Sequence, residues 1–445
     1  MTDVKRLCLI FAALVLMILA GCGIFRPVEE TAVPPPTSAG ATSVNATAEL
    51  STPDGGTPTG TPADSGPETL VLWTSEDYAP TSDTEGGTLL LEQIQGFQSE
   101  YGVGVDVILK RRTGTGGLLD FLVTTSGAAP SILPDLITLS DVDLYRAARA
   151  GLLQPLDTHL SPEFLDDQFD FARALVQLGG TTYGVLYQAD LDHLVYDTAA
   201  FETPPLTWED VYTSTEPFVF SPAAPVDKIN DVILIQYLDR GGTLTDAAGQ
   251  PSLNGDQLIE ALSFFQQARR AGVIPVSVLD LSDATTAWAT YRIGEAGMVQ
   301  GPASIYLAER AGLSSSSASA VPLAEPGTTT VGHGWALAMV TQDPARQELA
   351  AALIEHLLSP ENNGAWTQAA NRLPASGTAL DAWAPNDAYV PFVRELLRDA
   401  RPAANPGVAA VVGAPLSQAL IDVLSGRASP EEAAQAAVQA VEAGR

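Results

Sequence analysis

The stretch from Gly179 to Thr198 constrains the fold most, because polar residues separate two apolar runs inside it. Tyr183, Val185 and Tyr187 recur at every second position, which is the period of a β-strand. A second apolar run follows at residues 194–196. The polar residues between the two runs are Gln188, Asp190, Asp192 and His193.

Two interpretations of this pattern stay open from these residues alone. A buried carboxylate is costly unless it is paired or hydrogen-bonded. The stretch is therefore either a backbone crossing beside a wet cavity, with the acids on the cavity wall, or an edge hairpin whose polar tip is solvated.

Length and charge limit the possible classes of function. The chain has 445 residues, enough for two or three domains. It carries 53 acidic residues against 22 basic ones, a net charge of −31. Such a surface repels polyanions, so we expect no nucleic-acid partner.

The N-terminus has the pattern of an export signal with a lipid anchor. Lys5 and Arg6 precede an apolar run at residues 7–19, which is too short to span a bilayer. The run ends in Leu19-Ala20-Gly21-Cys22, which resembles a bacterial lipobox. We expect a signal peptide over residues 1–21 and a lipid on Cys22, which would anchor the chain to the extracytoplasmic face of the cell membrane.

Residues 22–67 differ in composition from the rest of the chain. They are rich in Pro, Thr, Ser, Gly and Ala and hold few large apolar side chains. Such a composition cannot offset the entropy of ordering, so we expect a disordered tether. The sequence holds only Cys8 and Cys22, both near the N-terminus, so the folded part is expected to have no disulfide.

From residue 68 onward, short apolar strands alternate with polar loops and helices, which indicates an α/β fold with a parallel sheet. Strands are predicted at 70–73, 103–109 and 134–139. Ligands of open α/β sheets bind at the carboxyl ends of the strands. The loops that begin at Thr74 and Ser140 are therefore candidate parts of a binding site.

An enzyme is the main rival class. The sequence contains no HExxH, no GxSxG and no phosphate-binding loop ending in GK[ST]. The four histidines show no metal-ligand spacing. We expect Asp190 and Asp192 to point to opposite faces of their strand, which disfavours joint action as glycosidase acids. We therefore expect no enzymatic activity, no cofactor and no metal.

In the order and spacing of its segments, the chain resembles the extracellular solute-binding proteins of family 1. These are the capture subunits of ABC importers for sugars and related solutes. The segments that carry the resemblance include LVLWTSEDY (70–78), PDLITLSDVDLYRAARAGLLQPLD (134–157), TTYGVLYQADLDHLVYD (181–197), GHGWALAM (332–339) and LLSPENNGAWTQAANRLPASG (357–377).

The resemblance implies a two-lobed periplasmic-binding-protein-like (type II) fold, with crossing hinge strands and a ligand cleft between the lobes. It places residues 68–186 and 326–364 in the N-terminal lobe, and residues 187–325 and 365–445 in the C-terminal lobe. One hinge strand is expected at 183–190 and a second at 323–330.

The same resemblance, residue by residue, implies a set of ligand-binding positions. They lie in the loops after the first and third strands, on the hinge side, and in the glycine-aromatic segment. The ten candidates are Glu76, Asp77, Tyr78, Asp141, Tyr187, Asp190, Ser304, His333, Trp335 and Arg372. The family often has a tryptophan after a Gly-Pro pair, where this chain has Ala303, so sugar stacking would fall to Trp335, Tyr187 or Tyr78.

Carboxylates that accept hydroxyl hydrogen bonds, together with aromatic rings that stack on sugar faces, favour a mono- or oligosaccharide as the solute. A cationic solute such as a polyamine is the alternative, because acids outnumber the one basic candidate. A sensor-associated binding protein is a further alternative. The expected partners are ABC permease subunits and, through the lipid, the membrane; the chain is expected to be a monomer.

Overall fold

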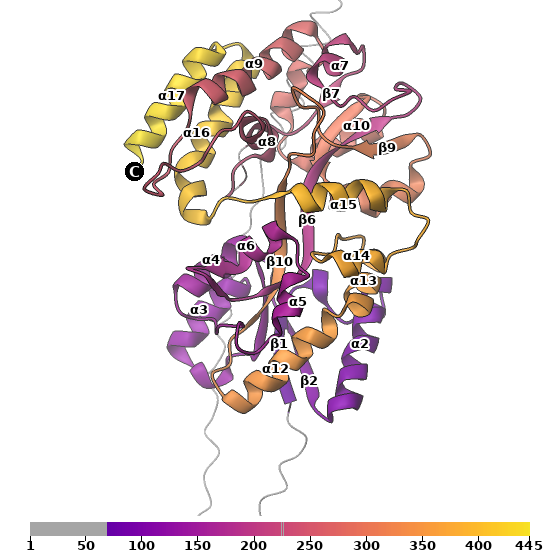
Figure 1. The fold of residues 1–445 in the computed structure, drawn as a ribbon, viewed down its shortest axis with the longest axis vertical. Helices are drawn as coiled ribbons and strands as arrows, with labels where there is room; N and C mark the ends of the chain where they lie inside the picture. The colour runs from indigo at the N-terminus through magenta and orange to yellow at the C-terminus, as the bar shows by residue number, and fades with distance from the viewer. Residues whose placement is uncertain (1–68, 224, 226) are drawn as a thin grey trace, which may run out of the picture. The chain divides into compact units, whose positions relative to one another are not determined.

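The computed structural model describes residues 69–223, 225 and 227–445, all within one compact unit. The expected signal peptide, the lipid-carrying Cys22 and the tether lie outside the described residues. A mixed sheet runs through the unit in the order β2-β1-β3-β10-β6-β8-β7, with β9 paired to β6 and β11 (Arg401–Pro402) paired to β10. Helices surround the two ends of this sheet and form two lobes (Figure 1).

The N-terminal lobe is built on three parallel strands, as the alternating pattern predicts. These are β1 (Thr69–Thr74), β2 (Gly104–Leu109) and β3 (Leu136–Ser140). The helices and short strands of this lobe are α2 (Glu85–Tyr101), α3 (Leu118–Ala128), α4 (Asp141–Arg149), α5 (Pro162–Asp166), α6 (Asp170–Val176), β4 (Gln177–Leu178), β5 (Thr181–Thr182) and α12 (Pro344–Leu357).

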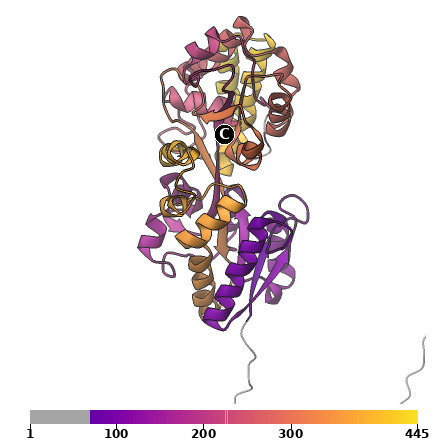
Figure 2. The same cartoon turned by 90° about the vertical axis from the view of Figure 1, so that its right-hand side faces the viewer.

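Two long antiparallel strands connect the lobes, β6 (Val185–Asp197) and β10 (Val331–Met339). Figure 2 shows both strands passing through the narrow region between the lobes. Because β6 is a central strand, the edge-hairpin interpretation of this stretch is wrong. The hinge strand expected at 323–330 is also misplaced: the strand begins at Val331, and the residues before it form a loop.

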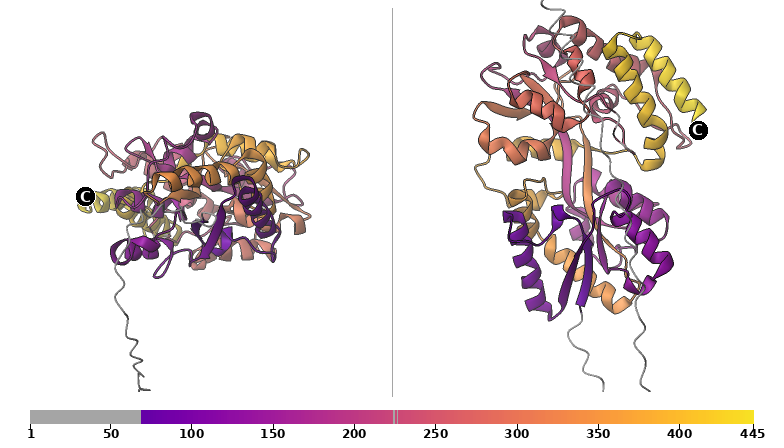
Figure 3. Two further views of the ribbon diagram at one scale, coloured as in Figure 1. Left: turned by 90° about the horizontal axis from the view of Figure 1, so that it is seen from below. Right: turned by 180° about the vertical axis from the view of Figure 1, so that it is seen from behind.

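The C-terminal lobe continues the sheet with β7 (Phe218–Val219), β8 (Met298–Pro302) and β9 (Ser316–Ser319). Its helices, seen from behind in Figure 3, are α7 (Trp208–Thr213), α8 (Asp231–Asp239), α9 (Gly255–Ala271), α10 (Ala284–Arg292), α11 (Ala303–Glu309), α16 (Pro406–Ser425) and α17 (Pro430–Ala443).

Helix ends follow the sequence signals. Thr207 and Asp210 form the reciprocal capping box that starts α7. Gly102 ends α2 with a φ of 68°, a backbone conformation that glycine adopts without a Cβ penalty. The apolar helix α16 is long enough to cross a membrane by composition, but more than half of its apolar window is buried and it packs against α9 and α17. It therefore serves as a core helix of this lobe.

Three further helices lie near the junction of the lobes: α13 (Pro360–Ala369), α14 (Gly377–Asp381) and α15 (Tyr389–Asp399). α13 packs against α2 and α14. The lobe boundary expected after residue 364 thus falls inside a helix that contacts the N-terminal lobe.

Candidate functional site

A cavity of about 370 Å³ lies where β6 and β10 pass between the lobes. Its wall is formed by β6, β8, β10, the segment ahead of α8 and the start of α10, together with Arg112 from the N-terminal lobe. The charged and amide side chains on this wall are Arg112, Gln188, Asp190, Asp192, Lys228, Asn230, Asp231, Asp283, Gln300 and His333.

Gln188, Asp190 and Asp192 all line this cavity from β6. The expectation that Asp190 and Asp192 point to opposite faces was wrong, because residues two apart on a strand share a face. The polar positions that interrupt the two apolar runs are therefore explained together: they face a cavity instead of the packed core.

Asp190 is tied to the start of α11. Its carboxylate accepts hydrogen bonds from the Ser304 backbone N–H at 3.1 Å and from the Ser304 hydroxyl at 2.5 Å. Asp190 thus satisfies the helix terminus, as acidic side chains do at N-termini, and it still lines the cavity. Ser304 belongs to the site through this contact and is not itself on the cavity wall.

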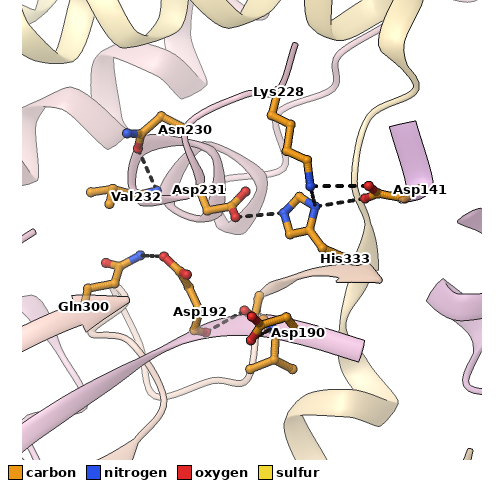
Figure 4. Close-up of polar contacts among 11 residues, drawn as sticks. Asp141, Asp190, Asp192, Lys228, Asn230, Asp231, Val232, Gln300 and His333 are labelled. Atoms are coloured by element: carbon orange, nitrogen blue, oxygen red, sulfur yellow. Dashed lines mark hydrogen bonds and ion pairs between the residues drawn. The ribbon is translucent and has the colours of Figure 1, made fainter. Parts of the chain in front are cut away.

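His333 is held between two carboxylates, as Figure 4 shows. Its Nδ1 lies 3.1 Å from Asp141 Oδ2, and its Nε2 lies 2.8 Å from Asp231 Oδ2. Asp141 follows β3, whereas Asp231 starts α8 in the other lobe. The imidazole on the hinge strand therefore connects acids from both lobes.

The pKa values of this cluster follow from its contacts. Burial and the charge of Lys228 oppose protonation of His333, but Asp231 and Asp141 outweigh both and raise its pKa to about 9. Burial alone would raise the pKa of Asp141, but the His333 hydrogen bond and the charge of Lys228 lower it to about 2. At neutral pH the imidazole is therefore protonated and donates from both ring nitrogens.

Two ion pairs join α4 to the segment ahead of α8. Lys228 Nζ lies 3.3 Å from Asp141 Oδ1. Arg146 lies 3.0 Å from Asp227. The first pair includes a side chain of Asp141 that is only 4% exposed, whereas the second is largely exposed on both sides. Both contacts cross from the N-terminal to the C-terminal lobe beside the cavity.

Trp335 lines the cavity but is only 8% exposed. The Arg112 guanidinium lies 4.3 Å from the centroid of the Trp335 ring, a cation–π arrangement. Asp77 holds that guanidinium in an ion pair of 2.7 Å. Asp77 therefore meets the cavity through Arg112, and the arginine occupies part of the ring that a sugar would stack on.

Three of the ten expected residues line the cavity, three contact residues that line it, and four do neither. Tyr78 and Tyr187 are buried in the core, with ring centroids 4.2 Å apart and both edge-on to Trp366. Glu76 is exposed on the loop after β1, and Arg372 bonds the Asn371 carbonyl. Of the other six, Asp190, His333 and Trp335 line the cavity, whereas Asp77, Asp141 and Ser304 bind residues that line it.

Several wall residues were not among the sequence candidates. Gln188 and Asp192 carried a signal, since both interrupt an apolar strand, but only Asp190 was selected from that run. Lys228 and Asp231 sit in a short polar segment directly before a buried helix. Arg112 had no local signal, because only the packing of the lobe brings it to Trp335.

Within the described ranges, no group of three or more His, Cys, Asp and Glu side chains has the arrangement of a metal site. Of the acids on the cavity wall, Asp190 is bound to Ser304, and Asp231 is bound to His333 through one of its two oxygens. What the arrangement offers a ligand is a set of hydrogen-bond acceptors and donors on a mixed wall.

Comparison with known proteins assigns the class. The family model for bacterial extracellular solute-binding proteins matches residues 92–391. The chain therefore belongs to the bacterial extracellular solute-binding proteins, which confirms the family expected from the sequence.

Its relatives bind sugars. A maltotriose-binding protein of Pyrococcus abyssi is 24% identical over 201 residues, which span 44% of this chain and 43% of that relative. The cyclic alpha-maltosyl-1,6-maltose binding protein of Arthrobacter globiformis superimposes with a TM-score of 0.69 at 19% identity, covering 85% of this chain and 99% of that one. The Listeria monocytogenes maltose-binding periplasmic protein, in complex with maltose, gives 0.68 at 17% identity, with 84% and 97% covered.

These structural similarities confirm the two-lobed type II fold. The matched proteins are binding proteins and not enzymes, and their family is extracellular.

Proposed function

We propose that this chain captures a mono- or oligosaccharide outside the cytoplasm and delivers it to the permease subunits of an ABC importer. The observation that carries the proposal is the cavity between the lobes, where carboxylates and amides accompany Trp335. Several hydrogen-bonding groups around an aromatic side chain suit a polyhydroxylated ligand. The sugar-binding relatives support the same solute class.

The proposal also covers the location and the oligomeric state of the protein. Cys22 carries a lipid that anchors the protein to the extracytoplasmic face of the membrane, and the chain acts as a monomer without catalytic activity. Mass spectrometry of the mature N-terminus tests the anchor: an unmodified chain, or one that starts elsewhere, would contradict it. We propose the lobe ranges 68–186 with 326–364 and 187–325 with 365–445; the boundary at 364 falls inside α13.

A thermal-shift screen with maltose, maltotriose, other neutral oligosaccharides and spermidine tests the solute class. A ligand that binds only the folded state stabilises it by about 2.7 kcal/mol at one hundred times its Kd. We expect at least one neutral oligosaccharide to raise the Tm. A rise with spermidine and with no sugar would show that the solute is a polyamine.

The polyamine alternative has one specific observation in its favour. Four carboxylates line the cavity, against two side chains with a permanent positive charge, Lys228 and Arg112. Both of those cations are already paired with acids, Asp141 and Asp77.

Two substitutions distinguish a binding role from a structural one. Asp190→Asn keeps the size of the side chain but weakens its acceptors, and Trp335→Ala removes the ring. If the residues contact the sugar, affinity falls by roughly ten- to hundredfold for Asp190→Asn. If Trp335 only packs, its loss costs roughly 3–5 kcal/mol of stability with affinity unchanged. Titration calorimetry beside denaturant melts separates the two outcomes.

A further inference from the structure

Asp192 is the one acid on the cavity wall that is nearly buried and forms no ion pair with any described residue. It is 9% exposed, and its Oδ2 accepts a long hydrogen bond of 3.3 Å from the Gln300 amide. Asp231 lines the same cavity as Asp192, and its Oδ1 is buried with no hydrogen-bond partner among the described residues. The cavity wall therefore holds two carboxylates, Asp192 and Asp231, whose negative charge is only partly balanced by neighbouring cations.

The positively charged side chains of the surrounding elements form ion pairs with acids other than Asp192. His333 on β10 donates to Asp141 and Asp231. Lys228, ahead of α8, pairs with Asp141. Arg112 pairs with Asp77 and covers Trp335. None of these groups makes an ion pair with Asp192 in the described part of the chain, so any full compensation has to come from the solute.

A neighbour on the same strand also lacks a partner. Gln188 is 5% exposed and lines the cavity, and its buried Oε1 has no hydrogen-bond partner in the described part of the chain. It lies on the same face of β6 as Asp190 and Asp192. A buried amide oxygen without a hydrogen bond lowers the stability of the fold unless a ligand group donates a hydrogen bond to it. The amide is suited to a hydroxyl group, whereas the carboxylates beside it are suited to a cation.

We propose that the solute is an amino sugar, or an oligosaccharide that contains one, whose protonated amine binds between Asp192 and Asp231. This inference rests on the proposed sugar-binding function and narrows its substrate class. The sugar hydroxyls use Gln188, Asn230 and Gln300, and the ammonium group lies beside Asp192, with which no cation among the described residues forms an ion pair. A charge-assisted hydrogen bond of this kind is about twice as strong as a neutral one.

The electrostatics of the unliganded site agree with this assignment. Burial, and then the charge of Asp231, raise the pKa of Asp192 well above the ordinary aspartate value. The ionised form is therefore costly in the absence of a ligand. An ammonium group beside the carboxylate removes that cost, because an opposite charge favours the ionised form.

The test compares sugars that differ only by an amine. Titration calorimetry is run with the full mature chain on glucose, 2-amino-2-deoxyglucose and 6-amino-6-deoxyglucose, and on cellotriose beside the β-1,4-linked glucosamine trimer. Maltotriose and spermidine complete the set. We expect at least one amino sugar to bind roughly tenfold or more tightly than its neutral counterpart.

Asp192→Asn then removes the charge at constant size. We expect this variant to lose the amine preference, so that the amino sugar and its neutral counterpart bind it with affinities within about threefold of each other. Asp283→Asn is the matched control, because Asp283 lines the same cavity but is exposed. Asparagine serves equally well as the N-cap of α10, so this control should keep the preference.

The outcomes separate this inference from the proposed function. If neutral sugars bind and no amino sugar binds more tightly, the inference is overturned and the sugar-binding function stands. If spermidine binds and no sugar does, both are overturned. An amine preference that survives in Asp192→Asn also overturns the assignment, since the ammonium group would then bind elsewhere. A thermal melt of Asp192→Asn with bound neutral sugar verifies that the variant is folded.

Discussion

His193 and His333 lie on the two neighbouring hinge strands, and their surroundings leave one neutral and the other positively charged near pH 7. His193, on β6, is fully buried among Tyr306, Tyr389 and Phe392. Its Nε2 lies 3.1 Å from the Tyr389 hydroxyl, and its Nδ1 has no hydrogen-bond partner within the described ranges. His333, on β10, is also largely buried, with 16% of its side chain exposed.

Burial lowers the pKa of His193 to about 4, so this imidazole is neutral near pH 7. The same desolvation acts on His333, but two carboxylates reverse its effect and raise the pKa to about 9. Burial alone therefore does not decide the charge of a histidine in this hinge. The partners decide it, and each pKa predicts how the fold responds to pH and mutation.

The largest expected effect comes from removing one of the carboxylates that distinguish His333 from His193. Asp141→Asn leaves His333 and Lys228 with an uncompensated charge beside a side chain that is 4% exposed. Breaking a buried ion pair from one side costs roughly 3–5 kcal/mol, so the unfolding free energy should fall by that amount. Urea denaturation measures it.

Asp143→Asn on the same helix is the control. Asp143 is also largely buried, but its ion pair with Arg146 is long, 3.7 Å, and the arginine is 40% exposed. We expect a loss of less than about 1 kcal/mol. Equal losses in the two variants would mean that Asp141 contributes to the stability of α4 and not to the charge of His333.

The second expected effect is on the pH dependence of stability. Between pH 6.5 and about 9 the folded chain keeps a proton on His333 that the unfolded chain has released, so stability falls as pH rises. Between pH 6.5 and about 4 the unfolded chain protonates His193 and the folded chain does not, so stability falls as pH drops. In each of these two pH ranges, called the upper limb and the lower limb, the unfolding free energy changes by roughly 3 kcal/mol.

Chemical denaturation across pH 4 to 9 measures both limbs as differences between the wild type and a variant, which removes the contribution of titrating groups that do not interact with the substituted histidine. His333→Gln should flatten the upper limb alone, and His193→Gln the lower limb alone. A variant that changes the opposite limb would contradict the assigned protonation states.

At a fixed pH near 7 the two glutamine variants should lose different amounts of unfolding free energy. His333→Gln removes a cation between Asp141 and Asp231, and leaves Lys228 to compensate only the first, so we expect a loss of roughly 2–3 kcal/mol. His193→Gln keeps an amide near the Tyr389 hydroxyl and should cost about 1 kcal/mol. Equal costs would show that packing, not charge, dominates at His333.

The smallest effect is expected for the partner of His193. Tyr389→Phe removes one hydroxyl and leaves the ring contacts with Tyr306 and Phe392 in place. Loss of a single neutral hydrogen bond costs about 1 kcal/mol. Stability between pH 6.5 and about 9 should depend on pH as in the wild type, since Tyr389 does not contact His333. The same denaturation series measures this. A changed pH dependence in that range would show that the protonation of His333 depends on the surroundings of His193.

The sequence predicts the fold well because the fold depends on local patterns. Strand and helix periods, the capping box at Thr207 and the glycine that ends α2 all act over a few residues. The second hinge strand was misplaced because its start depends on pairing with β6 and not on its own composition. Long-range pairing of that kind leaves no signal in a single window.

The cavity wall was predicted only in part, for the same physical reason. Polar residues inside an apolar strand pointed to β6, and His333 and Trp335 came from a glycine-flanked segment. Arg112 and Asp231 reach the cavity only because packing brings together segments far apart in the sequence. Tyr78 and Tyr187 illustrate the converse: aromatic side chains beside a hinge stack on each other in the core.

The ion pairs that join α4 to the segment ahead of α8 bear on how long a captured solute stays bound. Asp141 and Arg146 belong to one lobe, and Lys228 and Asp227 to the other. The lobes cannot separate without breaking these contacts, so the residence time of a solute includes the lifetime of the ion pairs. Dissolved salt weakens exposed charge pairs most, and Arg146 with Asp227 is the more exposed of the two. The dissociation rate of the solute should therefore increase with ionic strength even where no charge touches the solute.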